Sequence, residues 1–70
     1  MKLGFLGAGN ISGMVAPAVQ SVKSICRVAV AARNLSDAQQ FAERWGFEKA
    51  YEGYEALLAD PEVEVVYILS

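Results

Sequence analysis

Short apolar runs alternate along the chain with segments whose apolar residues recur every three or four positions. Runs of the first kind predict strands, and the spacing of three or four predicts amphipathic helices. We expect strands at 2–6, 25–32, 49–52 and 63–69, and helices at 10–22, between Ser36 and Gly46, and at 54–59. Strands that alternate with helices lie parallel and are joined by right-handed crossovers. The pattern therefore predicts an α/β fold with a doubly wound sheet in the order 3-2-1-4.

The first predicted helix has one apolar face at helical spacing, which we expect to pack on the sheet. This face is formed by Ile11, Met14, Val15, Ala18 and Val19. Pro17 lies beyond the first turn, where it removes one backbone hydrogen bond, so we expect a bend in the helix there.

The second predicted helix has the clearest boundaries. Ser36 and Gln39 have the spacing of a capping box, and Gly46 suits the left-handed residue that ends a helix. In the third helix we expect Leu57 and Leu58 to face inward.

The chemistry begins where the first strand meets Gly7-Ala8-Gly9. A strand followed by Gly-x-Gly and a helix is typical of a dinucleotide-binding unit, the opening of a partial Rossmann fold. Gly7 permits the tight turn, and Gly9 lets the backbone approach a pyrophosphate. The following amides, from Gly9 to Ser12, point at the phosphates from the helix N-terminus, and Asn10 and Ile11 line that turn. Ser12 departs mildly from the Gly or Ala usual at the third position.

Arg33 follows the second strand, at the distance from the glycines where a ribose-reading residue belongs. An acid there would bind a ribose and repel a 2′-phosphate, whereas a guanidinium binds the phosphate. Asn34 could donate to the same group. This pattern predicts NADP as the cofactor, with NAD as the alternative. Asp37, the nearest acid, is interpreted as a residue that stabilises the helix dipole.

The last predicted strand ends at Leu69 and Ser70, at the carboxyl edge where open sheets bind ligands. We expect these two residues to contact a nicotinamide or a ribose. The acidic residues elsewhere have neither metal-ligand spacing nor an acid–base pair. They are Glu52, Glu55, Glu62 and Glu64. The sequence therefore predicts a cofactor site without metal ligands or catalytic residues.

Composition narrows the class of protein without identifying a reaction. The 70 residues are 54% hydrophobic and carry a net charge of −2, so we expect neither a nucleic acid nor a membrane as a partner. The single cysteine, Cys26, adjoins an apolar strand and is expected to be a buried thiol. We expect a reducing compartment, the cytoplasm.

Essentially the whole chain resembles the N-terminal domain of the glucose–fructose oxidoreductase/inositol dehydrogenase (Gfo/Idh/MocA) family. The most distinctive segment is Asp-Pro-Glu-Val-Glu-Val-Val-Tyr-Ile at 60–68. The segment Ala31-Ala32-Arg33 is especially similar to the same segment in members close to the dimeric dihydrodiol dehydrogenases. The other matching segments are 7–12, 28–34, 38–46 and 54–58.

The resemblance implies an NAD(P)-dependent oxidoreductase that acts on a small molecule such as a sugar, polyol or dihydrodiol, and we expect a homo-oligomer. The family's catalytic Lys and its substrate domain come later than these 70 residues. We therefore expect residues 1–70 to be the N-terminal part of a dinucleotide-binding domain, inactive alone and either marginally stable or self-associating.

Two other functions remain open at this stage. Gly-Phe-Leu-Gly-Ala-Gly-Asn at 4–10 is also similar to the opening of pyrroline-5-carboxylate reductases, although the segment at 60–68 argues against that class. A non-catalytic sensor module that only holds the nucleotide would share the same glycine turn.

Overall fold

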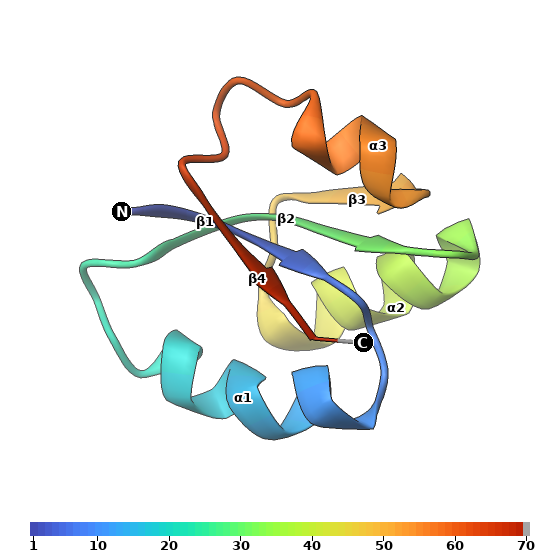
Figure 1. Cartoon of the computed structure of the whole chain (residues 1–70). Helices are drawn as coiled ribbons and strands as arrows, with labels where there is room; N and C mark the ends of the chain where they lie inside the picture. The colour runs from blue at the N-terminus through green and yellow to red at the C-terminus, as the bar shows by residue number, and fades with distance from the viewer. Residues whose placement is uncertain (70) are drawn as a thin grey trace.

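The computed structural model describes residues 1–69, in which strands and helices alternate (Figure 1). The elements are β1 (Lys2–Leu6), α1 (Asn10–Gln20), β2 (Cys26–Ala32), α2 (Leu35–Trp45), β3 (Lys49–Glu52), α3 (Tyr54–Leu58) and β4 (Val65–Ile68). All strand pairs are parallel, and the order is β3-β2-β1-β4. The predicted partial Rossmann fold and its order 3-2-1-4 are confirmed.

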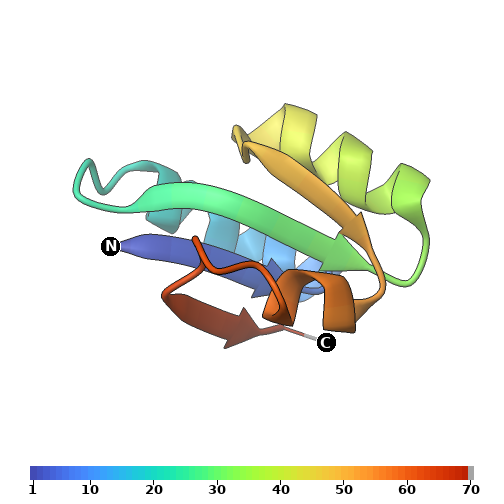
Figure 2. The same ribbon diagram turned by 90° about the horizontal axis from the view of Figure 1, so that it is seen from above.

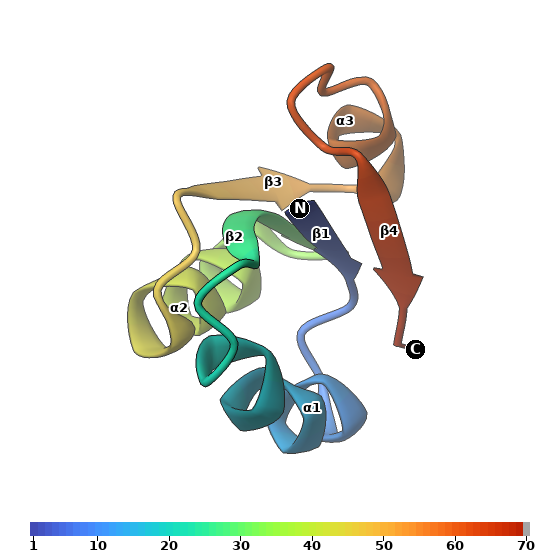
Figure 3. The same ribbon diagram turned by 90° about the vertical axis from the view of Figure 1, so that its left-hand side faces the viewer.

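Helices cover both faces of the sheet. Figures 2 and 3 show α1 and α2 on one face and α3 on the other. The core on the α1–α2 face consists of Leu3, Phe5, Ala16, Val19, Val30, Phe41, Ala42 and Phe47. The core on the α3 face consists of Leu6, Val28, Ala29, Ala31 and Leu57.

Phe5 is the centre of the larger core. Its side chain is fully buried, and its ring centroid lies 5.0 Å from that of Phe47 and 6.1 Å from that of Phe41. Tilted aromatic pairs at these distances stabilise a core beyond the area that they bury. The phenyl rings therefore join β1 in the middle of the sheet to α2 and to the turn that follows it.

Arg27 connects the carboxyl ends of α1 and α2. Its Nη1 donates to the Gln20 carbonyl and its Nε to the Gly46 carbonyl, each at 3.3 Å. A cation is favourable at the C-terminus of a helix, where carbonyls lack partners. Gly46 adopts the left-handed conformation, with φ of 74°, so its predicted role is confirmed.

The predicted apolar face of α1 is only partly correct, since of its five residues Val19 is buried and Val15 is half-buried against the core. Ile11, Met14 and Ala18 are exposed, whereas Ser12, Ala16 and Val19 are buried. The turn before the helix causes this rotation, because Ser12 Oγ donates to the Gly7 carbonyl at 2.8 Å. The hydroxyl is thereby satisfied under the helix, and the small Ala16 allows close packing on the sheet.

Three further expectations are corrected. Asn34, not Ser36, is the N-cap of α2, because its side-chain oxygen accepts from the amides of Ser36 and Asp37. Leu58 is 59% exposed because the short helix α3 packs on the sheet through Leu57 and Tyr54. Cys26 is exposed because it is the first residue of β2, at the margin of the sheet.

Several elements are shorter than predicted. The Ile25 amide donates to Val22 and the Val63 amide to Asp60, so these residues belong to turns that precede β2 and β4. The helices α1 and α3 end at Gln20 and Leu58, before the predicted ends at Val22 and Ala59.

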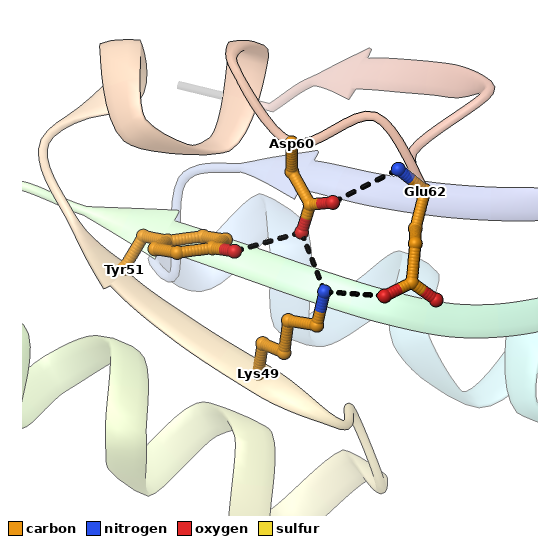
Figure 4. Close-up of polar contacts among 4 residues, drawn as sticks. All are labelled: Lys49, Tyr51, Asp60 and Glu62. Carbon is orange, nitrogen blue, oxygen red and sulfur yellow. Dashed lines mark hydrogen bonds and ion pairs between the residues drawn. The ribbon is translucent and has the colours of Figure 1, made fainter.

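A polar cluster attaches the α3–β4 connection to β3 (Figure 4). Lys49 Nζ lies 2.9 Å from Asp60 Oδ2 and 2.8 Å from Glu62 Oε1. Tyr51 Oη donates to the same Asp60 oxygen at 2.7 Å, and the Glu62 amide donates to Asp60 Oδ1 at 2.9 Å. Because β3 and β4 are at opposite edges of the sheet, these contacts hold a connection that crosses its face.

Charge-assisted hydrogen bonds shift the titration of this cluster. The bonds from Lys49, Tyr51 and the Glu62 amide lower the pKa of Asp60 from 3.8 to about 2. The same carboxylates raise the pKa of Lys49 above its ordinary value, with Glu62 as the larger cause. The hydrogen bond to Asp60 also raises the pKa of Tyr51.

We expect the cluster to stabilise the fold at neutral pH and to lose this effect in acid. The folded state binds the Asp60 proton more weakly than the unfolded chain does, so the contribution is complete above pH 3.8 and disappears as the pH falls through about 2. In urea unfolding from about pH 6 to about pH 2, Asp60→Asn should therefore lose less stability than the wild type.

Glu43→Gln is the control, since it removes an exposed acid of α2 outside the cluster. Equal pH dependence in wild type and Asp60→Asn would contradict this role of the cluster.

Candidate functional site

The chain has an open hollow at the carboxyl ends of the strands, beside the ends of β1 and β2. Its volume is about 530 Å³. We call it the edge hollow. It is lined by Ala8, Gly9, Asn10, Ile11, Ala32, Arg33, Asp37, Tyr54 and Leu69.

Backbone hydrogen bonds fix the segments around the edge hollow. The Gly7 amide donates to the Ala31 carbonyl at 2.8 Å, and the Leu69 amide donates to the Leu6 carbonyl at 3.0 Å. The Gly53 amide donates to the Ala32 carbonyl at 2.7 Å. The segments that leave β1, β3 and β4 are each tied to a neighbouring strand in this way, so the hollow is built on a fixed frame.

Gly7 makes the turn from β1 into α1. Its φ is 121°, which side chains rarely adopt, and an added Cβ would lie 3.1 Å from the Leu69 carbonyl oxygen. Its own carbonyl accepts the Ser12 hydroxyl at 2.8 Å. Gly7 is therefore required by the fold itself.

Gly9 differs from Gly7 in both respects. Its backbone is extended, with φ of −92° and ψ of −161°, and an added Cβ would meet no atom within 4 Å. Neither backbone conformation nor packing within the chain requires a glycine there. The space above Gly9 is instead open for a group from outside the chain.

The N-termini of α1 and α2 differ in electrostatics. No side chain caps α1, and its first turn has no acid. In contrast, Asn34 caps α2, whose first turn contains Asp37. The first amides of a helix lack partners and its dipole favours an anion, so the α1 N-terminus suits an anionic ligand.

Arg33 is the cation of the edge hollow. Its side chain is exposed, and no acidic group within residues 1–69 forms an ion pair with it. Arg33 also lines a second hollow of about 610 Å³, which begins beside Tyr54 and extends along α3. Its guanidinium is therefore available to a phosphate.

The structure brings together most of the residues that the sequence analysis selected. Arg33 and Leu69 line the edge hollow with the glycine-turn residues Ala8, Gly9, Asn10 and Ile11. Gly7 is buried beneath the turn, and Asn34 is not in the lining because its carboxamide oxygen caps α2. Ser70 lies outside the described residues.

Three lining residues were not predicted for the site. Ala32 is the last residue of β2, and Tyr54 begins α3 directly after β3, so their places at strand ends are the signal that could have selected them. Asp37 was interpreted only as a helix-dipole residue, yet it shares the edge hollow with Arg33. Its spacing of four residues from Arg33 is the signal that was missed.

Comparison with known families gives the relationship directly. The model of the oxidoreductase family with an NAD-binding Rossmann fold matches residues 1–70. The chain belongs to the Gfo/Idh/MocA family. This match over the whole chain also decides against the pyrroline-5-carboxylate reductase alternative.

Individual members of the Gfo/Idh/MocA family agree. The human trans-1,2-dihydrobenzene-1,2-diol dehydrogenase is 41% identical over 70 residues, which cover 97% of this chain and 21% of that protein. An uncharacterised oxidoreductase of Rhizobium meliloti is 38% identical over 69 residues, with 97% and 21% covered. The chain thus spans about a fifth of the length of these curated relatives.

A solved structure shows the same fold. KijD10, a 3-ketoreductase from Actinomadura kijaniata in complex with NADP and TDP-benzene, superposes with a TM-score of 0.90. It is 32% identical, and the match covers 96% of this chain and 21% of that protein.

Within residues 1–69, every helix is too short or too polar to cross a membrane.

The two glycines of the turn should respond differently to a methyl group. We expect Gly7→Ala to lower the free energy of unfolding by about 1–3 kcal/mol, because it forces a side chain into a strained conformation. Gly9→Ala should change it by less than about 0.5 kcal/mol, because its Cβ enters open space. Urea unfolding of both variants measures the difference. Equal losses would show that the open space above Gly9 has been misassigned.

Proposed function

We propose that this chain is the nucleotide-binding part of an oxidoreductase that uses NADP(H). In this proposal residues 1–70 form the N-terminal part of a dinucleotide-binding domain, and the substrate domain belongs to another part of the protein. The proposal rests mainly on one observation: the uncapped α1 N-terminus, the open space at Gly9 and the free Arg33 all face one hollow.

The edge hollow fits the chemistry of the cofactor. The α1 N-terminal amides would hold the pyrophosphate, which Gly9 would let approach the backbone. Arg33 would bind the 2′-phosphate through charge-assisted hydrogen bonds. When bound, the cofactor would supply or accept a hydride. The residues of this chain would bind and orient it.

Relatives support a small-molecule substrate. Several relatives in sequence are named as dehydrogenases of trans-1,2-dihydrobenzene-1,2-diol. KijD10 is a ketoreductase that was solved with NADP. We therefore infer that the complete protein transfers hydride between a nicotinamide and a sugar, polyol or dihydrodiol. A sensor that holds the nucleotide without turning over substrate would bind equally well. Assays of the complete protein for hydride transfer with sugars, polyols and dihydrodiols separate the two.

The first test concerns the phosphate-reading residue. Arg33→Asp should weaken NADPH binding by at least about 10-fold, because a charge-assisted contact is replaced by repulsion. NADH lacks the 2′-phosphate, so its affinity should change much less. Titration of nucleotide fluorescence gives both dissociation constants. Lys23→Asp makes the same charge change in the α1–β2 turn. This turn precedes the amino end of β2, away from the edge hollow, so both dissociation constants should stay unchanged. Equal NADPH affinity in wild type and Arg33→Asp would refute this assignment.

The second test uses the glycine that the fold does not need. Gly9→Ala should weaken both NADPH and NADH by about 10-fold or more, because its methyl group occupies the place of the pyrophosphate. The variant should unfold like the wild type, so a loss of binding cannot be attributed to a loss of structure. Undiminished affinity for both nucleotides would place the pyrophosphate elsewhere.

A further inference from the structure

An acidic residue and a basic residue both line the edge hollow. Arg33 ends β2, and Asp37 lies four residues later in the first turn of α2. We propose that Asp37 sets the preference of this site between NADP(H) and NAD(H): its carboxylate weakens NADP(H) and strengthens NAD(H). The inference rests on the proposed function, since it concerns the same nucleotide site.

The Asp37 carboxylate is available to a ligand. The residue is exposed, and within residues 1–69 its side chain forms no ion pair with Arg33 or with any other cation. Asn34 Oδ1 accepts from the Asp37 backbone amide at 3.4 Å, and within residues 1–69 no donor forms a hydrogen bond to the Asp37 carboxylate oxygens. The capped first turn therefore presents the carboxylate at the hollow.

A second cation is close to Asp37 but is directed elsewhere. Arg44 and Asp37 line an adjoining hollow of about 200 Å³ together with Gln40. The Arg44 guanidinium stacks over the Trp45 ring at 5.2 Å from its centroid. Arg44 is absent from the lining of the edge hollow, so Arg33 and Asp37 are the charged side chains that line it.

The two opposite charges act differently on a nucleotide with a 2′-phosphate and on one with a free 2′-hydroxyl. A 2′-phosphate carries up to two negative charges, so it is attracted by Arg33 and repelled by Asp37. A ribose with a free 2′-hydroxyl can donate to the carboxylate, which accepts hydrogen bonds only. The acid therefore reduces the advantage that Arg33 confers on NADP(H).

A purely structural role for Asp37 gives a different expectation. An acid in the first turn stabilises a helix through the dipole, and its removal would lower stability without changing the ratio of two affinities. The ratio of NADPH to NADH affinity is thus the quantity that separates the two roles.

The experiment compares Asp37→Asn and Asp37→Ala with the wild type by nucleotide fluorescence titration. Asp37→Asn removes the charge and keeps an acceptor, so NADPH should bind roughly 3- to 10-fold more tightly and NADH should change little. Asp37→Ala also removes the acceptor, so NADH should bind a few-fold more weakly. The gain in NADPH affinity should shrink as salt is raised, because salt screens the repulsion.

Glu43→Gln is the matched control. It removes one negative charge from the same helix, but Glu43 lies outside the edge hollow. A ratio in Asp37→Asn equal to that of the wild type, or an equal shift in Glu43→Gln, would overturn the inference and leave the proposed function intact. Failure of the wild type to bind either nucleotide would overturn the proposed function itself.

Discussion

The turn at Gly7 is the constraint on which the arrangement of the site depends. Its amide bonds to β2, its carbonyl accepts the Ser12 hydroxyl, and its Cα faces the Leu69 carbonyl at the end of β4. One residue thus links β1, β2 and the first turn of α1, and it lies close to the residue that follows β4. Because the positive φ removes the choice of residue, the direction of the α1 axis follows from the position of a single glycine.

The two helices that begin at the carboxyl ends of β1 and β2 contribute to the site in different ways. The first turn of α2 is satisfied internally by Asn34, so α2 contributes to the site through side chains. The first turn of α1 is not capped, so α1 contributes its backbone. Backbone amides recognise any phosphate, whereas side chains distinguish one nucleotide from another. In the proposed nucleotide site, general affinity and specificity would therefore be carried by different elements.

The sequence predicts the parts of this structure that depend on backbone chemistry. The glycine turn and the left-handed Gly46 follow from a residue type that tolerates positive φ, and the strand order follows from the alternation of strands and helices. The face of α1 could not be predicted in the same way. Most of its residues are apolar, so periodicity allows more than one buried stripe, and the choice depended on a hydroxyl that bonds to Gly7.

Competition between neighbouring side chains for the N-cap position of α2 explains another difference between the prediction and the structure. Asn34 and Ser36 are both good caps, and only the path of the chain out of β2 decided between them. The same ambiguity concealed Asp37, whose place in the first turn is equally suited to a helix dipole and to a ligand. Local patterns identify what a residue can do, while the neighbours that select one role come from distant segments.

The contrast between Gly7 and Gly9 also bears on how such proteins diverge. A lineage that no longer needs the nucleotide would still lose stability on replacing Gly7, but would lose little on replacing Gly9, which has open space above it. If the proposed site is correct, relatives that retain the first glycine and carry a side chain at the second position should fold in the same way and bind the nucleotide more weakly.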